Sequence, residues 1–444
     1  MEGIRYYDIR HVTGEATHID IDNGVVESAG TSFFDTAVIR ALGPKGWGIV
    51  TVENYSTRGR KERDEMIASA ARLAAITDED VRLAEPSFAV LPVPPMKEDP
   101  RTVGLEEKTA ILSTIERAAA GISGIRSTRA NYSERAETVH FEDVTGTEFT
   151  YETCRSGFGV LAVASRNGVV QMGYEPLHSI LGLNIRHQEE KGREAGERAV
   201  ALLDAGTPKG GIMNAVLDQE LAGVFAHEAV GHASEGDLVQ EGSSVLAGRI
   251  GEKIGNPGLT IVDDPTLPEF GFEPVDAEGS RVARTEIIRK GVVNSYLHSR
   301  ETLAAVGNGL SGHARAMPGE PPLVRMSNTF IENGDSAFDE IIGECRQGIL
   351  LKGSRGGQVD PGRGVFQFNA EYGYLIVDGE IGSMVRDVSL SGEILQTLHG
   401  IALLGNDRKM SQGYCGKGGQ SVPVSDGSPH VLLRDAVVGG SAAD

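Results

Sequence analysis

The segment that organises the chain is Phe225–Asp237, which reads FAHEAVGHASEGD. Two histidines, His227 and His232, flank the glutamate Glu228 on an otherwise apolar run. The apolar residues recur with helical periodicity, so we expect a helix over 218–233. Imidazole nitrogens are good zinc ligands, and a carboxylate beside them can accept a proton from water. The segment therefore predicts a metal-binding helix with Glu228 as general base.

The spacing of the two histidines imposes a condition on that helix. They stand at i and i+5, whereas the familiar zinc motif has its histidines at i and i+4 on one helix face. Residues at i and i+5 of an ideal helix point about 140° apart. Both can bind one ion if the helix is widened, as in a π-bulge, or ends near Gly231. An alternative pairs Glu228 with His232 on a regular helix, but it leaves no obvious general base.

Other candidate site residues lie outside the motif. Cys415 has glycines crowded around it, so that its sulfur can be approached closely. Asp237 is a candidate to hold a ligand histidine by a hydrogen bond, and equally a candidate cap of a helix or loop. Arg355, in a glycine-rich loop, has the geometry to bind a carboxylate, although a solvated loop residue is the simpler interpretation.

Four blocks of the sequence resemble the TldD/PmbA family of metallopeptidases, in particular its catalytic TldD type. They are HEAVGH at 227–232, EGD at 235–237, GGQVD at 356–360 and YCGKGGQ at 414–420. The resemblance implies that His227, His232 and Cys415 bind one zinc ion per chain, and it draws attention to Gly357 and Gln358 as substrate-binding candidates. It also implies that the zinc is enclosed in a dimer, formed with a second copy or with a related subunit that lacks the motif.

Composition limits the environment and the partners. The 444 residues suffice for two domains. With 42 basic and 63 acidic residues the net charge is −21, which argues against nucleic acid or an anionic membrane as partner. No apolar run approaches the roughly 18 residues of a membrane span, and Met1–Arg10 is too polar for a signal peptide. Three cysteines do not make a disulfide framework. We expect a cytoplasmic protein.

Periodicity predicts an α+β protein whose N-terminal domain, of mixed α and β structure, covers residues 1–205. Alternating residues in the first 55 positions predict strands, with a hairpin turn at 23–24. Amphipathic helices are expected at about 62–75 and 106–120, laid on an antiparallel sheet. A charged helix at 189–204 is expected to link the two domains.

The C-terminal domain, residues 206–444, is predicted to be β-rich and antiparallel, and to carry the metal-binding helix. Strands are expected at 365–370, 374–377 and 384–389. The glycine- and acid-rich passage 235–280 is predicted to be a loop over the site with little regular structure.

These patterns favour a zinc-dependent peptidase that acts on unfolded polypeptides or small peptides. Glu228 would take a proton from a metal-activated water and pass it to the leaving amine. A second hypothesis is a non-catalytic partner subunit that binds peptides and keeps a structural metal, although such a site needs no base. A third is a zinc amidohydrolase acting on a small amide. An extended peptide would add as a strand to a sheet edge of the second half.

Overall fold

The computed structural model describes residues 3–440, and its N-terminal half is built on one long antiparallel sheet of order β3-β2-β1-β4-β5-β6. At the turn between β1 and β2, Asn23 and Gly24 have φ of 48° and 78°, the left-handed conformation that two-residue hairpins favour. The elements of this half are β1 (Tyr6–Asp22), β2 (Val25–Gly43), β3 (Gly46–Glu53), η1 (Tyr55–Thr57), α1 (Arg60–Ala74), η2 (Pro100–Thr102), α2 (Leu105–Ala120), β4 (Ile125–Asp143), β5 (Glu148–Arg166), β6 (Val169–Ser179) and α3 (Glu189–Leu202).

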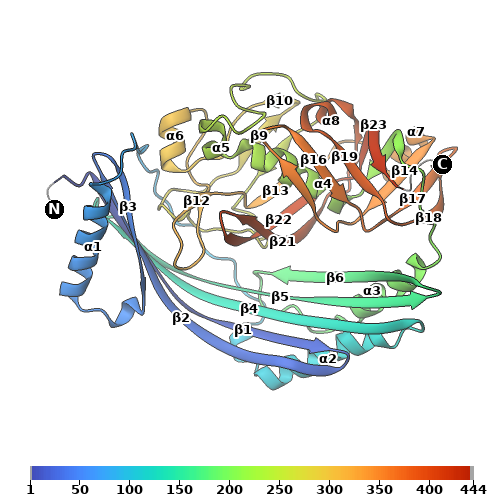
Figure 1. The fold of residues 1–444 in the computed structure, drawn as a ribbon, viewed down its shortest axis with the longest axis horizontal. Helices are drawn as coiled ribbons and strands as arrows, with labels where there is room; N and C mark the ends of the chain where they lie inside the picture. The colour runs from blue at the N-terminus through green and yellow to red at the C-terminus, as the bar shows by residue number, and fades with distance from the viewer. Residues whose placement is uncertain (1–2, 441–444) are drawn as a thin grey trace.

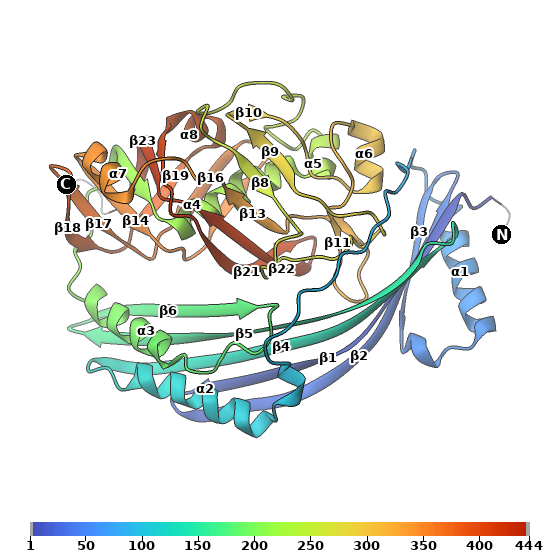
Figure 2. The ribbon, with the colours of Figure 1, turned by 180° about the vertical axis from the view of Figure 1, so that it is seen from behind.

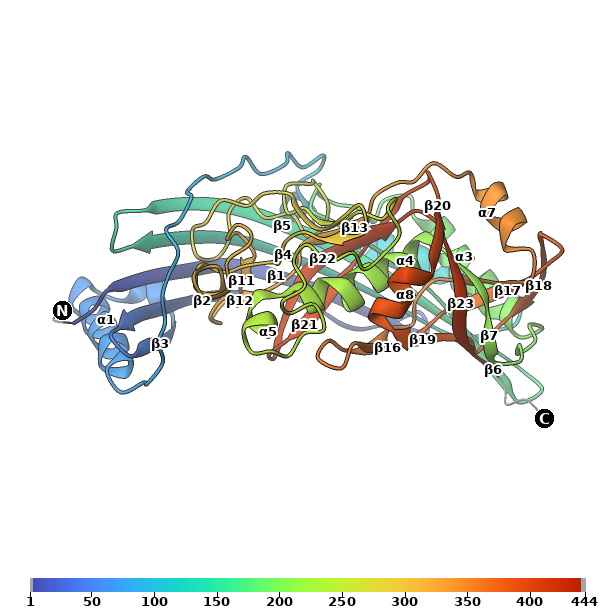
Figure 3. The same ribbon diagram turned by 90° about the horizontal axis from the view of Figure 1, so that it is seen from above.

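The two faces of this sheet have different partners, because successive residues of a strand point to opposite sides. Helices α2 and α3 cover the convex face (Figure 1), where Ile19, Tyr132 and Phe158 are buried beneath them. The concave face lies against the C-terminal half (Figure 2). Charged residues join the two there, as where Arg40 pairs with Glu278 at 3.1 Å. Helix α1 lies beyond the C-terminal half, at the end of the sheet where the chain begins (Figure 3).

The C-terminal half contains two larger sheets. The nine-stranded one consists of β7 (Gly211–Leu217), β14 (Gly348–Lys352), β15 (Gly357–Asp360), β16 (Val365–Asn369), β17 (Tyr372–Val377), β18 (Glu380–Val385), β19 (Ser389–Glu393), β20 (Ile401–Leu404) and β23 (Val431–Gly439). The six-stranded one consists of β8 (Ile261–Asp263), β9 (Thr285–Arg289), β10 (Val292–Val293), β13 (Asn328–Ile331), β21 (Lys409–Lys417) and β22 (Gln420–Ser428). A short pair is formed by β11 (Ala314–Arg315) and β12 (Leu323–Val324).

One apolar core joins the residues of both sheets to the segment that carries the histidines. The helical elements of this half are α4 (Gln219–Phe225), the π-helix η3 (Ala226–Gly231), η4 (His232–Ser234), α5 (Gly236–Gln240), α6 (Arg300–Val306), α7 (Phe338–Cys345) and α8 (Ile394–Gly400). Phe225, Ala229 and Val230 are buried in this core. Burial of these apolar side chains therefore fixes the position of the histidine-bearing segment.

The α+β fold class with antiparallel sheets is confirmed, with parallel pairing at β7–β14 and β13–β22 as the exceptions. The predicted strand at 384–389 is wrong, because β18 ends at Val385 and Asp387 has a φ of 53°. The passage 235–280 is largely irregular as predicted, but Leu246 and Leu259 are fully buried, so much of it packs into the core.

The division of the chain near residue 205 stays a prediction; α3 ends at Leu202 and β7 begins at Gly211. Among the residues described, no helix has both the length and the apolar character needed to cross a lipid bilayer.

Candidate metal centre

The histidine-bearing segment is one continuous helical run that changes its winding. It begins at Asp218, whose Oδ1 accepts a hydrogen bond from the backbone N–H of Leu221 at 3.0 Å and so caps α4. The helix then widens to π geometry over Ala226–Gly231. A π-turn adds residues to each turn, so that positions i and i+5 come to one face. Of the two distortions that the spacing allows, the structure has the widened helix, and the imidazole ring centroids of His227 and His232 are 5.5 Å apart.

Gly231 lets this segment approach the strand region beside it. A Cβ atom at this position would lie 3.0 Å from Cγ of Met326, which is fully buried. A larger residue would push the segment away from its neighbour and displace His232.

The hairpin of β21 and β22 brings the third candidate ligand to the two histidines. Cys415 lies on β21 opposite Val422, and its Sγ is 3.4 Å from Nε2 of His232. Candidate ligand atoms of His227, His232 and Cys415 all lie within 4.8 Å of one another. The structure thus brings together the three residues that the resemblance named.

The surroundings of His227 fit a metal site. Its side chain is 2 % exposed, and neither ring nitrogen has a hydrogen-bond partner among the described residues. Leaving buried polar nitrogens unpaired costs free energy, so native structures rarely do so without a ligand or water. Two imidazoles and a thiolate form a donor set that zinc prefers.

The electrostatics favour a thiolate at Cys415. Burial alone would raise the pKa of its thiol, but the nearby charge of His227 and the hydrogen bond and charge of His232 lower it to about 4. Burial likewise acts to lower the pKa of His232, yet Glu235 and the Cys415 sulfur raise it to about 10. In the absence of a metal, a thiolate at Cys415 therefore lies 3.4 Å from a protonated His232.

Glu228 occupies the accessible side of this cluster. Its side chain is 34 % exposed, and its Oε2 lies 3.6 Å from Nε2 of His232. A carboxylate with access to solvent beside a metal position is suited to exchange protons with water.

Glu235, which the sequence analysis did not single out, takes the position expected for Asp237. Its Oε2 lies 3.0 Å from Nδ1 of His232 and 3.1 Å from Nζ of Lys417. Asp237 instead pairs with Lys417 at 2.7 Å. Glu235 follows His232 by three residues, but it is extended where η4 ends, and no local pattern distinguishes it from Asp237.

Asp426 on β22 is a second carboxyl group that the sequence analysis missed. Burial raises its pKa to about 7; His227 opposes this rise, and Glu228 and Cys415 reinforce it. Sequence offers no local signal for this residue, because only the pairing of β13, β22 and β21 brings it beside the helix.

The glycine-rich candidates lie at the edge of the nine-stranded sheet. Gly357 and Gln358 are exposed residues of β15, and a Cβ at Gly357 would lie 2.3 Å from the carbonyl oxygen of Gln367. Arg355 donates to the carbonyl of Met172 on β6 at 3.2 Å. Within residues 3–440, no hydrogen bond or ion pair joins Arg355, Gly357 or Gln358 to the histidine cluster.

Solved structures share this fold over nearly the whole chain. TldE from Thermococcus kodakarensis superposes with a TM-score of 0.77 at 20% identity, covering 98% of this chain and 97% of that one. A Thermotoga maritima protein described as a proposed modulator of a DNA gyrase gives a TM-score of 0.81 at 20% identity, covering 98% and 96%.

Two sequence relatives match nearly the whole chain, and a third matches about half of it. A metalloprotease of Methanothermobacter thermautotrophicus is 40% identical over 443 residues, which cover 99% of this chain and 96% of that protein. A metalloprotease of Archaeoglobus fulgidus is also 40% identical, over 99% of this chain and all of its own length. The zinc metalloprotease TldD homolog of Saccharolobus solfataricus is 34% identical over 55% of each chain.

Family models match consecutive parts of the chain. They are described as PmbA/TldA metallopeptidase domain 1 at residues 7–75, central domain at 98–203 and C-terminal domain at 210–440. The resemblance seen in the four sequence blocks is thereby confirmed. The chain belongs to the TldD/PmbA family of metallopeptidases.

Proposed function

We propose that the protein is a zinc-dependent peptidase that hydrolyses peptide bonds in unfolded polypeptides or small peptides. One observation carries the proposal: the donor atoms of His227, His232 and Cys415 converge within 4.8 Å beside the partly exposed carboxylate of Glu228. Three protein ligands with a position left for water are typical of catalytic zinc, whereas structural zinc is closed by four.

The residues divide the chemistry among them. A zinc ion bound here, one per chain, would polarise the carbonyl of the scissile bond and make water more acidic. Glu228 accepts the proton of the attacking water at its carboxylate and returns it to the leaving amine. Glu235 accepts a hydrogen bond from Nδ1 of His232, which leaves Nε2 as the nitrogen facing Cys415.

The free edge of β21 is where we propose that the substrate binds. This strand ends the six-stranded sheet and pairs there with β22 alone. An extended peptide adds to such an edge through its main chain, which tolerates many different side chains. Because Cys415 lies on this strand, a peptide added there passes beside the cluster.

We propose a dimer as the active form, with a second copy or with a related subunit that lacks the motif, in the cytoplasm. An apolar patch supports an interface on the nine-stranded sheet: Ile212 and Val437, which pair across β7 and β23, are 72 % and 44 % exposed. Large exposed apolar side chains that cluster often mark protein interfaces. Light scattering on the wild type and on Ile212→Asp tests this, since the charge should shift the mass to that of the monomer.

The deciding experiment compares the wild type with Glu228→Gln on an unfolded protein and on small amides. We expect turnover of the unfolded protein to fall by roughly 10²–10⁴-fold, with the zinc content unchanged, because glutamine cannot accept the proton. Glu241→Gln is the control: Glu241 is an exposed glutamate outside the histidine cluster, so this variant should keep its turnover. Equal turnover by the wild type and Glu228→Gln rejects the catalytic role, and hydrolysis of small amides alone favours an amidohydrolase.

A further inference from the structure

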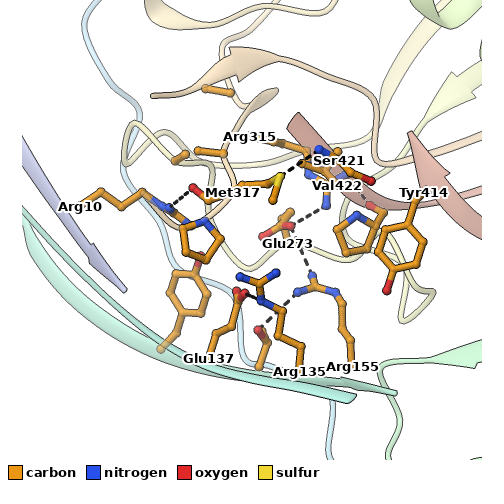
Figure 4. A pocket seen from close by; sticks show the side chains of 17 residues that line it. Arg10, Arg135, Glu137, Arg155, Glu273, Arg315, Met317, Tyr414, Ser421 and Val422 are labelled. Atoms are coloured by element: carbon orange, nitrogen blue, oxygen red, sulfur yellow. Dashed lines mark hydrogen bonds and ion pairs between the residues drawn. The ribbon is translucent and has the colours of Figure 1, made fainter. Parts of the chain in front are cut away.

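A cavity of about 100 Å³ lies between the concave face of the N-terminal sheet and the C-terminal half. Four arginines enter it from opposite walls (Figure 4): Arg10, Arg135 and Arg155 from the sheet, and Arg315 from β11. We call this space the arginine cavity. Its volume is enough for several water molecules, and hence for a small ion with oxygen atoms.

The cations in this cavity outnumber the anions that face them. Glu273 lies between two arginines, 3.3 Å from Arg155 and 2.7 Å from Arg315. Glu137 pairs with Arg135. Four arginines therefore share two carboxylates, in a chain whose overall charge is −21.

Arg10 is the cation without a counterion. It is 7 % exposed, and within residues 3–440 its side chain makes one hydrogen bond, from Nη1 to the carbonyl of Met317 at 3.3 Å. Its Nε has no partner among residues 3–440, and no ion pair is formed by this residue in the same range. A buried guanidinium without an anion is costly, because it has lost water without gaining an opposite charge.

Arg315 is also buried, and it shares its counterion, Glu273, with Arg155. Its Nη1 donates to the carbonyls of Met326 and Pro423. It is 4 % exposed and its Nε has no partner within the described chain. Burial lowers the pKa of its guanidinium; Glu273 opposes this effect, and the neighbouring Arg155 adds to it. An anion placed among these groups would stabilise the charged form of each arginine.

We propose that the arginine cavity binds a small oxyanion, a carboxylate or phosphate group, between Arg10 and Arg315. Guanidinium groups suit such ligands because their N–H donors match the oxygen geometry of both. The anion would neutralise the excess charge and join the sheet to the C-terminal half.

The bound anion would also support the strand that carries Cys415. Tyr414 lines the cavity, as does its cross-strand partner Pro423. Because successive strand residues face opposite sides, Tyr414 faces the cavity while Cys415 faces the histidines. This inference does not depend on peptidase activity, since the cavity lies on the other side of the hairpin.

Calorimetric titration of the full-length, zinc-loaded protein tests the proposal. The two probes are inorganic phosphate and succinate, each in a low-salt buffer free of other oxyanions. We expect one or both to bind, more weakly as chloride is raised, and Arg10→Met to weaken binding at least about tenfold. Arg193 is an exposed arginine of α3, so Arg193→Met should leave the affinity for either oxyanion unchanged.

The comparison between phosphate and succinate identifies the oxyanion, and either result supports the site. Arg10→Met changes a buried residue and could fail to fold, so Arg135→Met is a second test, because the Arg135 side chain is 40 % exposed. It should weaken binding several-fold while its circular dichroism spectrum matches that of the wild type. The proposal is overturned if neither probe binds the wild type at millimolar concentration. Equal affinity of the wild type, Arg10→Met and Arg135→Met would overturn it as well.

Discussion

Oε2 of Glu235 lies 3.0 Å from Nδ1 of His232, and both side chains are buried at the end of the π-helical segment. Burial alone would raise the pKa of Glu235, but His232 and Lys417 hold it below its usual range, so the carboxylate stays charged. A charged acceptor at Nδ1 fixes the orientation of the ring and makes the other nitrogen a better ligand.

Removing that charge should weaken metal binding without altering the shape of the site. We expect Glu235→Gln to reduce zinc affinity by about 10–100-fold, the usual effect of losing such a partner. A competition titration with a zinc chelator measures it. Asp237→Asn is the matched control, because Asp237 contacts Lys417 and not the histidine; a loss as large as that of Glu235→Gln would contradict the assignment.

Cys415 should be the cysteine on which zinc content depends. In Cys415→Ser, a hydroxyl that is neutral near pH 7 replaces a thiolate, and zinc bound per chain, measured by elemental analysis after dialysis, should fall to near zero. Cys345→Ala removes another buried thiol and should leave zinc content unchanged. Full retention of zinc by Cys415→Ser would show that the ion, if bound, is held elsewhere.

Zinc affinity should rise with pH in the neutral range. Without metal, His232 keeps its proton up to a pKa of about 10, and the ion must displace that proton to bind. Cys415, with a pKa of about 4, is already a thiolate. The association constant should therefore increase about tenfold per pH unit for each proton displaced. Competition titrations at about pH 6, 7 and 8 measure this slope, and a flat profile would count against a protonated His232.

Arg198 should contribute to the attachment of the two halves. From α3 it pairs with Glu175 on β6, and its Nη1 lies 2.9 Å from Oε2 of Glu371 in the C-terminal half. Because the Arg198 side chain is 20 % exposed, we expect Arg198→Met to lower the free energy of unfolding by only about 1–2 kcal/mol. Urea denaturation measures the change, which should shrink at high salt.

The control for that change is Arg193→Met on the same helix. Arg193 pairs with Glu190 at the surface, with side chains 46 % and 64 % exposed, so the loss should stay below about 0.5 kcal/mol. Similar losses for the two variants would mean that the Arg198 contacts do not stabilise the junction.

Local sequence sufficed where local forces decide the structure. The turn at 23–24 was predictable because asparagine and glycine tolerate positive φ, and α1 and α2 because amphipathic periodicity selects a helix. The charged run at 189–204 likewise predicted α3. The break between β18 and β19 was missed, since the run 384–389 looks continuous in sequence although Asp387 has a positive φ.

At the site, the sequence by itself determined the ligand-bearing helix. The spacing of His227 and His232 requires the helix to widen or to end if both are to face one ion, and this chain has the widened form. Cys415 could be placed beside them only through resemblance to a family, because 183 residues separate it from His232.

Only the tertiary structure decided which acid holds His232 and which cations gather in the arginine cavity. Glu235 and Asp237 are two residues apart, and the direction in which the chain leaves the helix determines which of them reaches the ring. Arg10 and Arg315 line one cavity because the curved N-terminal sheet packs against the C-terminal half. Such contacts join distant parts of the chain, so their energies depend on packing and desolvation that no local pattern encodes.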